Sequence, residues 1–345
     1  MSRLNNLPEK ILIVAPSWIG DAVLSQPLLA RLAARRPAPV IDVLAPKWVL
    51  PVYQRMPEVA ETIENPFGHG QLALAQRRRL GRVLASRGYS HAYVLPNSLK
   101  SALVPWFAGI RTRIGYTGEM RYGLLTERRV LDEQQLPLMV ERFAWLAQPE
   151  GSTLERPVAH PRLRVAMAEF NEACQRLGLP SSRRLACFCP GAEFGPAKRW
   201  PADHFSNLAR RLAERGFAVW LLGSGADKPV GEQIARASGG TATNLCGTTS
   251  LDEAIVLLSG AQLVVTNDSG LMHVAAALDR PTIALYGSSS PAFTPPLSDA
   301  ARVVKLDLSC SPCFARTCPL RHFDCMVKLD PARVMQQVEE LGLHT

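Results

Sequence analysis

The fold is decided most clearly by the stretch LVVTNDSGLMHVAAALDRPTIALYG, residues 263–287. An apolar run over 262–266 predicts a buried strand, and apolar residues continue at helical spacing over 269–278. A second apolar run follows at 282–286, after a proline. A strand, a helix and a strand in this order predict one unit of a parallel sheet with its crossover helix.

The same alternation extends outward from this stretch over most of the chain. Apolar runs predict strands at 10–16, 40–45, 91–96, 185–190 and 218–222, and helical spacing predicts helices over 21–36, 71–87, 165–177, 204–215 and 331–343. We therefore predict an α/β protein with two doubly wound parallel sheets. In such sheets ligands bind at the carboxyl ends of the strands.

The length of 345 residues suggests two domains. A polar, proline-rich segment at 149–162 predicts the connection between them, and residues 180–182 are a second candidate. We predict a first domain over 1–165, a second over 180–328, and a C-terminal helix over 329–345 that packs back toward the first domain.

The net charge of +9 lies entirely in the first half. Residues 1–165 hold 22 Lys and Arg against 13 Asp and Glu, whereas residues 166–345 hold 17 of each. Such asymmetry predicts contact with nucleic acid, acidic lipid or a phosphorylated acceptor, or else is a solubilising excess. The sequence contains neither a long apolar span nor a signal-peptide core, so we expect a cytoplasmic protein.

Two junctions carry candidate catalytic groups. The turn PSWIGD at 16–21 places Asp21 at a helix start, either as an N-cap or as a general base. The loop GAEFGPAKRW at 191–200 brings Lys198 to a helix start and suits a phosphate group, or is a solvated basic loop. The glycine fingerprint of dinucleotide binding is absent, which disfavours a dehydrogenase.

The turn after the strand at 262–266 is the strongest signal. The backbone N–H groups of Ser269 and Gly270 would point at a pyrophosphate, whereas Asp268 would cap the helix or accept hydrogen bonds from a sugar. His273 is either a phosphate donor or a packed helix residue. Asp227, after another strand, is either a ribose ligand or a cap.

Cysteines and arginines form two further groups. Cys310, Cys313, Cys318 and Cys325, with His322 nearby, resemble a structural zinc site, and free thiols are the alternative. Asn97 follows a predicted strand. The basic residues of the first half suit phosphates or carboxylates, or are solvated surface charges: Arg77, Arg78, Arg79, Lys100, Arg111, Arg113, Arg121, Arg128 and Arg129.

Taken together, four segments closely resemble the ADP-heptose:lipopolysaccharide heptosyltransferases, inverting enzymes of glycosyltransferase family 9. They are PSWIGDAVLSQPLL (16–29), YVLPNSLKSALVPWFAGIRTRIGYTGEMRYGLL (93–125), CPGAEFGPAKRWP (189–201) and VTNDSGLMHVAAALDRPTIALYGSSSPAFTPPLS (265–298). The resemblance implies the GT-B fold, with two Rossmann-like domains facing an interdomain cleft.

The resemblance also implies roles for the matched residues. Asp21 would deprotonate the acceptor hydroxyl, and Lys198 would steady the departing diphosphate. The donor would be bound by Glu193, Lys198, Asp227, Thr249, Asp268, Ser269, Gly270 and His273. The acceptor would be bound by Asn97, Lys100 and Arg121. Catalysis would require neither a cofactor nor the cysteines.

The implied reaction moves L-glycero-D-manno-heptose from ADP-heptose to the first heptose of heptosyl-Kdo2-lipid A. The enzyme would contact the cytoplasmic face of the inner membrane peripherally, because its acceptor is an anionic lipid. Addition of the first heptose to Kdo2-lipid A is the alternative within the family. A basic nucleic-acid-binding protein is the alternative from another class, although no nucleic-acid-binding motif is present.

Overall fold

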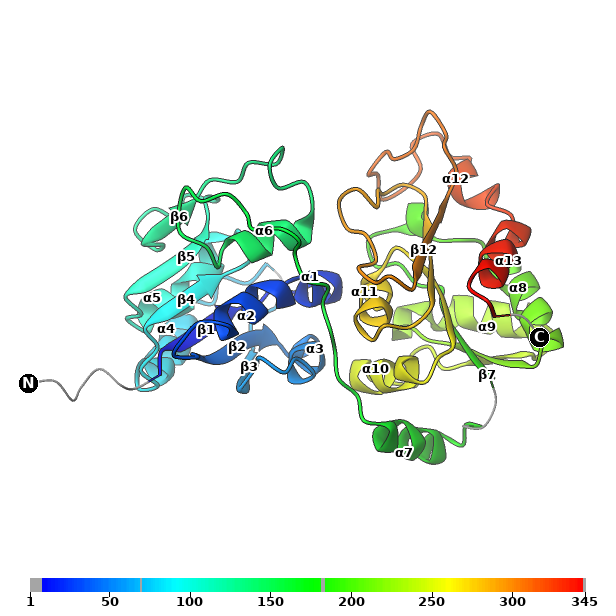
Figure 1. The fold of residues 1–345 in the computed structure, drawn as a ribbon, viewed down its shortest axis with the longest axis horizontal. Helices are drawn as coiled ribbons and strands as arrows, with labels where there is room; N and C mark the ends of the chain where they lie inside the picture. Colours follow the sequence, from blue (N-terminus) through cyan, green and yellow to red (C-terminus); the bar gives the residue numbers. More distant parts are fainter. Residues whose placement is uncertain (1–7, 69, 181–183, 344–345) are drawn as a thin grey trace, which may run out of the picture. The chain divides into compact units, whose positions relative to one another are not determined.

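The computed structural model describes residues 8–68, 70–180 and 184–343. The chain forms two compact units that divide between Pro161 and Arg162, close to the predicted end of the first domain (Figure 1). Residues 181–183, part of the second candidate linker, lie outside the described residues. Each unit is built on one six-stranded sheet, and every strand pairing is parallel. The predicted α/β, doubly wound fold class is confirmed.

The sheet of the first unit has the order β3-β2-β1-β4-β5-β6. Its strands are β1 (Lys10–Val14), β2 (Val40–Pro46), β3 (Glu61–Asn65), β4 (His91–Val94), β5 (Thr112–Tyr116) and β6 (Glu127–Arg129). From β1 the sheet is extended in one direction by β2 and β3 and in the other by β4, β5 and β6, so the switch point lies between β1 and β4. Loops that leave these two strands therefore border the point where ligands bind in open sheets.

The helices of the first unit form two groups. One group comprises α1 (Ile19–Leu24), α2 (Gln26–Ala33), α3 (Leu50–Gln54) and α6 (Met139–Trp145), and α1 contacts the other three. The second comprises α4 (Leu74–Ala85), the 3-10 turn η1 (Leu99–Ala102) and α5 (Leu103–Phe107). Residues from α4 and α5 share a hydrophobic core with β1, β2 and β4.

The single helix predicted over 21–36 is two helices. Helix α1 ends at Leu24, and α2 begins at Gln26, with Pro27 in its first turn. Proline lacks an N–H group and its ring clashes with the preceding turn, so a continuous helix is disfavoured there. The break limits Asp21 to a helix of six residues.

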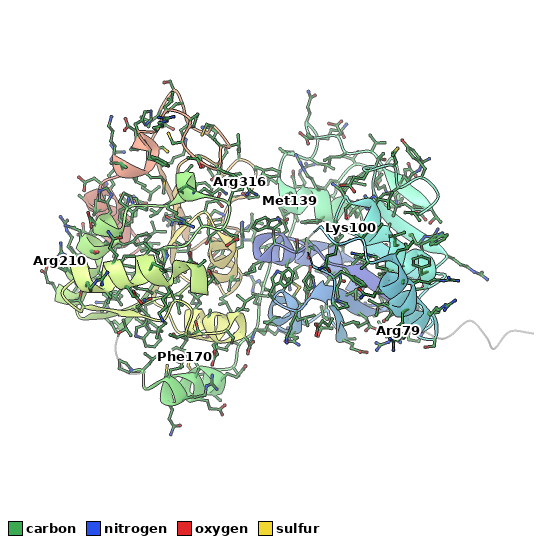
Figure 2. All side chains as sticks on the ribbon, turned by 180° about the vertical axis from the view of Figure 1, so that it is seen from behind. Arg79, Lys100, Met139, Phe170, Arg210 and Arg316 are labelled. Atoms are coloured by element: carbon green, nitrogen blue, oxygen red, sulfur yellow. The ribbon has the colours of Figure 1, made fainter. Side chains whose placement is uncertain are left out.

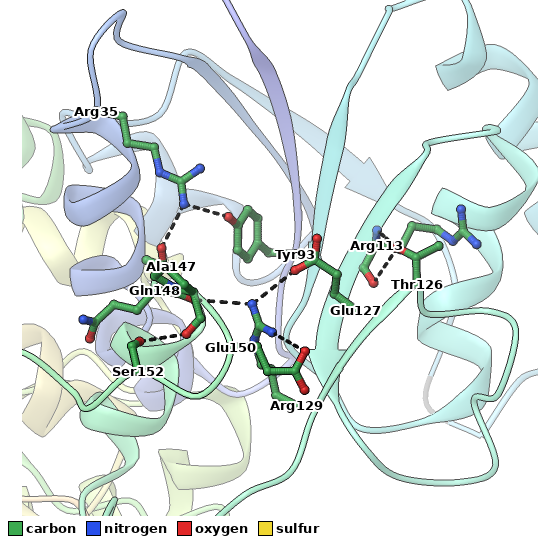
Figure 3. A network of polar contacts seen from close by, with 11 residues as sticks. Arg35, Tyr93, Arg113, Thr126, Glu127, Arg129, Ala147, Gln148, Glu150 and Ser152 are labelled. Carbon is green, nitrogen blue, oxygen red and sulfur yellow. Dashed lines mark hydrogen bonds and ion pairs between the residues drawn. The ribbon is translucent and has the colours of Figure 1, made fainter.

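A polar network joins β6 to the residues that follow α6 (Figure 3). The buried Arg129 pairs with Glu127 at 3.2 Å and with Glu150 at 3.1 Å. Nearby, the Arg35 guanidinium donates to the Tyr93 hydroxyl at 3.1 Å and to the Ala147 carbonyl at 2.9 Å. These contacts fasten the C-terminal part of the unit to its sheet.

The sheet of the second unit has the order β12-β11-β10-β7-β8-β9. Its strands are β7 (Arg184–Cys189), β8 (Phe217–Leu221), β9 (Ala242–Asn244), β10 (Leu263–Asn267), β11 (Thr282–Tyr286) and β12 (Ala301–Lys305). Because the strands are parallel, the loops after β7, β8, β9, β10 and β11 all leave the same edge of the sheet.

The second unit contains α7 (Met167–Leu177), α8 (Ala202–Glu214), α9 (Lys228–Ala237), α10 (Leu251–Ser259), α11 (Gly270–Ala277), α12 (Asp324–Val327) and α13 (Pro331–Glu340), with 3-10 turns η2 (Pro196–Lys198) and η3 (Gly225–Asp227). The C-terminal helix α13 packs against α8, β11 and β12. These contacts are with its own unit, and packing toward the first domain stays a prediction. No helix in the described part of the chain is long and apolar enough to cross a membrane.

Candidate active site

Asp21 lies just after β1, in the first turn of α1, and is partly buried. Burial raises the pKa of its carboxyl from 3.8 to about 6. Among the described residues, no side chain donates a hydrogen bond to it or pairs with it. A carboxylate with this pKa is ionised at neutral pH and remains basic enough to accept a proton.

The surroundings of Asp21 are fixed by contacts behind it. The buried Tyr53 of α3 shares a hydrogen bond of 3.0 Å with Ser25, which follows α1. Burial raises the pKa of Tyr53, and the nearby Asp21 charge raises it further. The Trp48 indole donates to the Ser17 carbonyl at 3.0 Å and closes the turn before α1. The segment that carries Asp21 is therefore held at both ends.

Arg121 is only 2% exposed, which does not fit direct contact with an acceptor. Its guanidinium donates to the Pro96 carbonyl at 2.7 Å, to the Tyr116 carbonyl, and to Asn97 Oδ1 at 3.4 Å. Burial lowers the pKa of Arg121 to about 10. The structure thus uses Arg121 to hold the exposed Asn97 at the carboxyl end of β4. Acceptor binding by Asn97 and by Lys100, in η1, stays a prediction.

Other members of the predicted basic group also have internal partners. Arg77 donates to three backbone carbonyls, Arg113 donates to the Leu124 carbonyl, and Arg129 belongs to the network of Figure 3. The sequence does not reveal these roles, because residue type alone does not show whether an arginine side chain is buried or exposed to solvent. Arg78, Arg79, Arg111 and Arg128 are exposed, as expected for surface charges.

In the second unit, Lys198 and Asp268 meet at the carboxyl edge of the sheet. Lys198 Nζ lies 2.6 Å from Asp268 Oδ2, although the residues are 70 positions apart. Ser289, in the loop after β11, donates to the same oxygen at 2.5 Å. The Asp268 side chain is 5% exposed and the Lys198 side chain 16%. An ammonium group and a hydroxyl thus neutralise and orient a buried carboxylate.

Asn267 aligns the two loops that carry this cluster. Its side-chain amide donates to the Pro190 carbonyl at 2.7 Å and accepts from the Trp200 N–H at 3.0 Å. Both ends of the loop that contains Lys198 are thereby attached to the end of β10. Sequence reasoning missed Asn267 and Ser289 as site residues. Each is a polar residue at or just after the end of a buried strand, which is the signal that would have found them.

His273 lies in α11 and is 5% exposed. Burial lowers the pKa of its imidazole to about 4, a shift that the nearby Asp268 opposes and Lys198 reinforces. The ring is therefore neutral at pH 7. Within the described residues its buried Nδ1 has no hydrogen-bond partner. A neutral imidazole can still donate one hydrogen bond, but it contributes no positive charge.

Ser269 and Gly270 form the start of α11, as predicted. Ser269 is the extended N-cap residue, and Gly270 is the first residue of a helix that runs to Ala277. The Ser269 side chain makes no capping hydrogen bond, so the first N–H groups of the helix are left for other acceptors. They lie directly after Asp268, whose backbone N–H is bonded to the Leu285 carbonyl at 3.2 Å.

Asp227 makes the hydrogen bonds expected of a capping residue, which is one of the two roles predicted for it. Its carboxylate accepts from the Ser224 N–H at 2.9 Å and from the Ser224 hydroxyl at 2.8 Å. A Cβ atom added at Gly191 would lie 2.4 Å from Asp227 Oδ2, so this glycine lets the carboxylate approach the loop after β7. The structure brings Asp227 to the GAEFG loop, and its role as a ribose ligand stays a prediction.

Glu193 and Thr249 are not brought into the Lys198–Asp268 cluster. Glu193 is exposed on the loop after β7 and has no contact with the cluster among the described residues. Thr249 follows β9, where its hydroxyl donates to the Leu245 carbonyl at 3.4 Å. Both lie in loops at the same edge of the sheet as the cluster, and donor binding by them stays a prediction.

The zinc prediction is not supported. Within the described residues no three His, Cys, Asp or Glu side chains are arranged to hold a metal ion, and all four cysteines of the loop are free thiols. The loop instead supports the site. The Arg316 carbonyl accepts from the Ala197 N–H at 3.1 Å, and the Phe314 N–H donates to the Ser288 carbonyl at 2.6 Å. Loop residues therefore brace both segments that reach Asp268.

Two parallel six-stranded sheets of this topology, one in each unit, have the architecture of the GT-B fold. The sequence model of glycosyltransferase family 9 (heptosyltransferase) matches residues 77–323. The chain belongs to this family, as the resemblance implied, and it is an enzyme.

Individual relatives match nearly the whole chain. Lipopolysaccharide heptosyltransferase 2 of Escherichia coli is 48% identical over 97% of this chain and 99% of its own length. The protein of the same name from Salmonella typhimurium is 47% identical over 96% and 98%. The solved structure of E. coli ADP-heptose lps heptosyltransferase II superimposes with a TM-score of 0.88, at 46% identity, over 97% of this chain and 98% of that one.

Proposed function

We propose that the chain transfers L-glycero-D-manno-heptose from ADP-heptose to the first heptose of heptosyl-Kdo2-lipid A, during synthesis of the lipopolysaccharide inner core. The observation that carries this proposal is the 47–48% sequence identity, over nearly the whole chain, to relatives named heptosyltransferase 2. It covers both units, and so includes Asp21 as well as the Lys198–Asp268 cluster. Neither a nucleic-acid-binding protein nor a dehydrogenase is favoured by any of these matches.

The chemistry assigned to the site follows from its charges. The acceptor hydroxyl attacks the anomeric carbon of the donor, its proton passes to the Asp21 carboxylate, and the bond to the diphosphate breaks with inversion. ADP leaves as an anion. Lys198 and the free N–H groups at the start of α11 would stabilise that developing charge. Family 9 heptosyltransferases need no catalytic cofactor for this reaction.

The acceptor places the enzyme at a membrane. Its lipid anchor lies in the bilayer, and its inner core carries carboxylates and phosphates. We propose peripheral contact at the cytoplasmic face of the inner membrane, which the excess of positive charge in the first half would favour. Asn97 and Lys100, at the carboxyl end of β4 and in η1, are the proposed contacts with the acceptor, and Arg121 positions Asn97.

ADP release from ADP-heptose tests the function, with EDTA present and with three additions: heptosyl-Kdo2-lipid A, Kdo2-lipid A, or no acceptor. Release that depends on heptosyl-Kdo2-lipid A supports the proposal. Release with Kdo2-lipid A instead would identify the enzyme that adds the first heptose. No release under any condition, also with Mg²⁺ restored, would refute the proposed substrates.

Ser289→Ala tests the organisation of the donor cluster. Removing the hydroxyl takes one of two donors from Asp268 Oδ2, so the carboxylate loses its fixed orientation. We expect ADP-heptose to bind about tenfold more weakly by titration calorimetry, equivalent to one hydrogen bond to a charged group. Ser290→Ala is the control, since the Ser290 hydroxyl accepts from the Ala292 N–H and, among the described residues, makes no bond to Asp268. Equal donor affinities in the two variants would contradict a positioning role for Ser289.

A further inference from the structure

Residues 65–118 contain eight Lys and Arg residues but no Asp or Glu. This stretch runs through α4, β4, η1 and α5 of the first unit. At the acidic content of the whole chain, about five acidic residues would be expected over such a length. The positive charge of the first half is therefore concentrated in this stretch of the chain.

Helix α4 presents three arginines on one face. At 3.6 residues per turn, the exposed Arg78, Arg79 and Arg82 fall within one sector of the helix, opposite the buried Leu84. Figure 2 labels Arg79 on this outer side. Leu74 and Val83 lie at the two edges of the same face and are 51% and 58% exposed. The face thus combines a cationic centre with an apolar rim.

The three arginines have no ion-pair partner in the described part of the chain. By contrast Arg87, which follows the helix, pairs with Glu61 at 2.6 Å. Unpaired arginines separated by one turn or less repel one another, so the face is electrostatically unfavourable when isolated. A polyanionic partner would remove this repulsion and would accept bidentate hydrogen bonds from the guanidinium groups.

The apolar rim is held in place from behind. The buried Arg77 donates to the Leu72 carbonyl at 2.7 Å and to the Lys100 carbonyl at 3.1 Å, and its guanidinium lies 4.1 Å from the Phe67 ring centroid. These bonds fix the loop that carries Leu72, itself 54% exposed, just before the helix.

A second close contact joins α4 to α5, which carries another exposed apolar side chain. A Cβ atom added at Gly81 would lie 2.5 Å from Phe107 Cβ, so α4 and α5 pack closely. Trp106, which neighbours Phe107 in α5, is 45% exposed. Exposed arginines, leucines and tryptophan together are the composition of a surface that lies in the interfacial region of a bilayer.

We propose that this α4 face seats the first unit on a bilayer that carries anionic phosphate headgroups. The face comprises Leu72, Leu74, Arg78, Arg79, Arg82, Val83 and Trp106. Its arginines bind lipid phosphates, and its apolar side chains enter the interface between them. The proposal rests on the proposed function in one respect only, that a lipid-linked acceptor requires the enzyme at a membrane. A nucleic acid would satisfy the arginines but not the apolar rim.

Vesicle flotation tests the α4 face. The full chain is mixed with vesicles of phosphatidylcholine alone or of phosphatidylcholine with phosphatidylglycerol. We expect binding to the mixed vesicles, weakened by salt, and little binding to phosphatidylcholine. The variant Arg78→Gln/Arg79→Gln/Arg82→Gln should partition onto mixed vesicles about 100-fold less, because each basic residue at the surface contributes independently.

The matched control is Arg211→Gln/Arg236→Gln/Arg333→Gln, which removes the same charge from exposed positions of the second unit. It should bind as the unmodified chain does. Equal losses in both triple variants, equal binding to both kinds of vesicle, or tighter binding to duplex DNA than to mixed vesicles would each overturn the proposal.

Activity separates this proposal from the proposed function. With an acceptor oligosaccharide that lacks lipid, the α4 variant should release ADP at the rate of the unmodified chain. A loss of release in the variant alone would assign these arginines to the soluble acceptor and overturn the membrane proposal. A lack of release in the unmodified chain, together with normal vesicle binding, would refute the function and leave the α4 face intact.

Discussion

Replacing Asp21 with Asn is expected to lower kcat by about 10²–10⁴-fold while ADP-heptose still binds. The amide is the same size as the carboxylate but cannot accept the proton of the acceptor hydroxyl. Donor groups lie in the second unit and are untouched by the change. Single-turnover ADP release measures the chemical step, and titration calorimetry measures donor affinity. Turnover near that of the unmodified enzyme would exclude Asp21 as the base.

Stability serves as the control for this variant. The pKa of Asp21 is raised to about 6 by burial, so the folded protein holds the ionised side chain at a cost. This cost develops as the pH rises from the unfolded value near 3.8 through about 6, and Asn removes it. The free energy of unfolding at pH 7.5 should rise by up to about 3 kcal/mol in urea denaturation. Lost activity therefore cannot be attributed to lost folding.

Replacing Lys198 with Met is expected to lower kcat by about 10²–10³-fold and to weaken ADP binding. The variant loses the ammonium group that would face the departing diphosphate. It also leaves Asp268 as a buried carboxylate whose one remaining side-chain partner, among the residues the structure describes, is the Ser289 hydroxyl. Breaking a buried pair from one side costs about 3–5 kcal/mol when solvent is fully excluded. We expect a smaller loss in the free energy of unfolding, because Lys198 keeps some exposure.

The double variant Lys198→Met/Asp268→Asn separates these two effects. Removing both charges should restore much of the stability, because no unpaired charge is left buried. Activity should remain as low as in Lys198→Met, or lower. Recovery of activity together with stability would show that Lys198 serves only to neutralise Asp268, and would exclude it as a stabiliser of the leaving diphosphate.

Strand–helix alternation predicted both sheets because buried parallel strands give continuous apolar runs. Several of the elements that were missed carry weak patterns. Strand β3 (ETIEN) is largely polar at a sheet edge, and β6 has three residues, two of them arginines. Helix α3 contains a proline within five residues. The apolar spacing also predicted one helix where the structure has α1 and α2, because spacing does not take account of the steric clash at Pro27.

Candidate site residues could be predicted from the sequence only where they lie together in one short motif. Asp268, Ser269 and Gly270 are consecutive residues of one turn, so their proximity in space follows from their proximity in the sequence. The bond from Ser289 to Asp268 joins loops after neighbouring strands and depends on strand order, which the sequence does not state. Arg121 shows the reverse case. Its charge suggested a ligand contact, but its burial and its backbone partners make it a support for Asn97.

The pH dependence of kcat/KM for heptosyl transfer shows whether the Asp21 carboxylate is the base. The raised pKa predicts an acid limb with a midpoint near pH 6 and an about tenfold fall at pH 5, as Asp21 becomes protonated. This limb should vanish from the low residual activity of Asp21→Asn. A rate that stays constant from pH 8 to pH 5, or an acid limb that persists in the variant, would contradict the account.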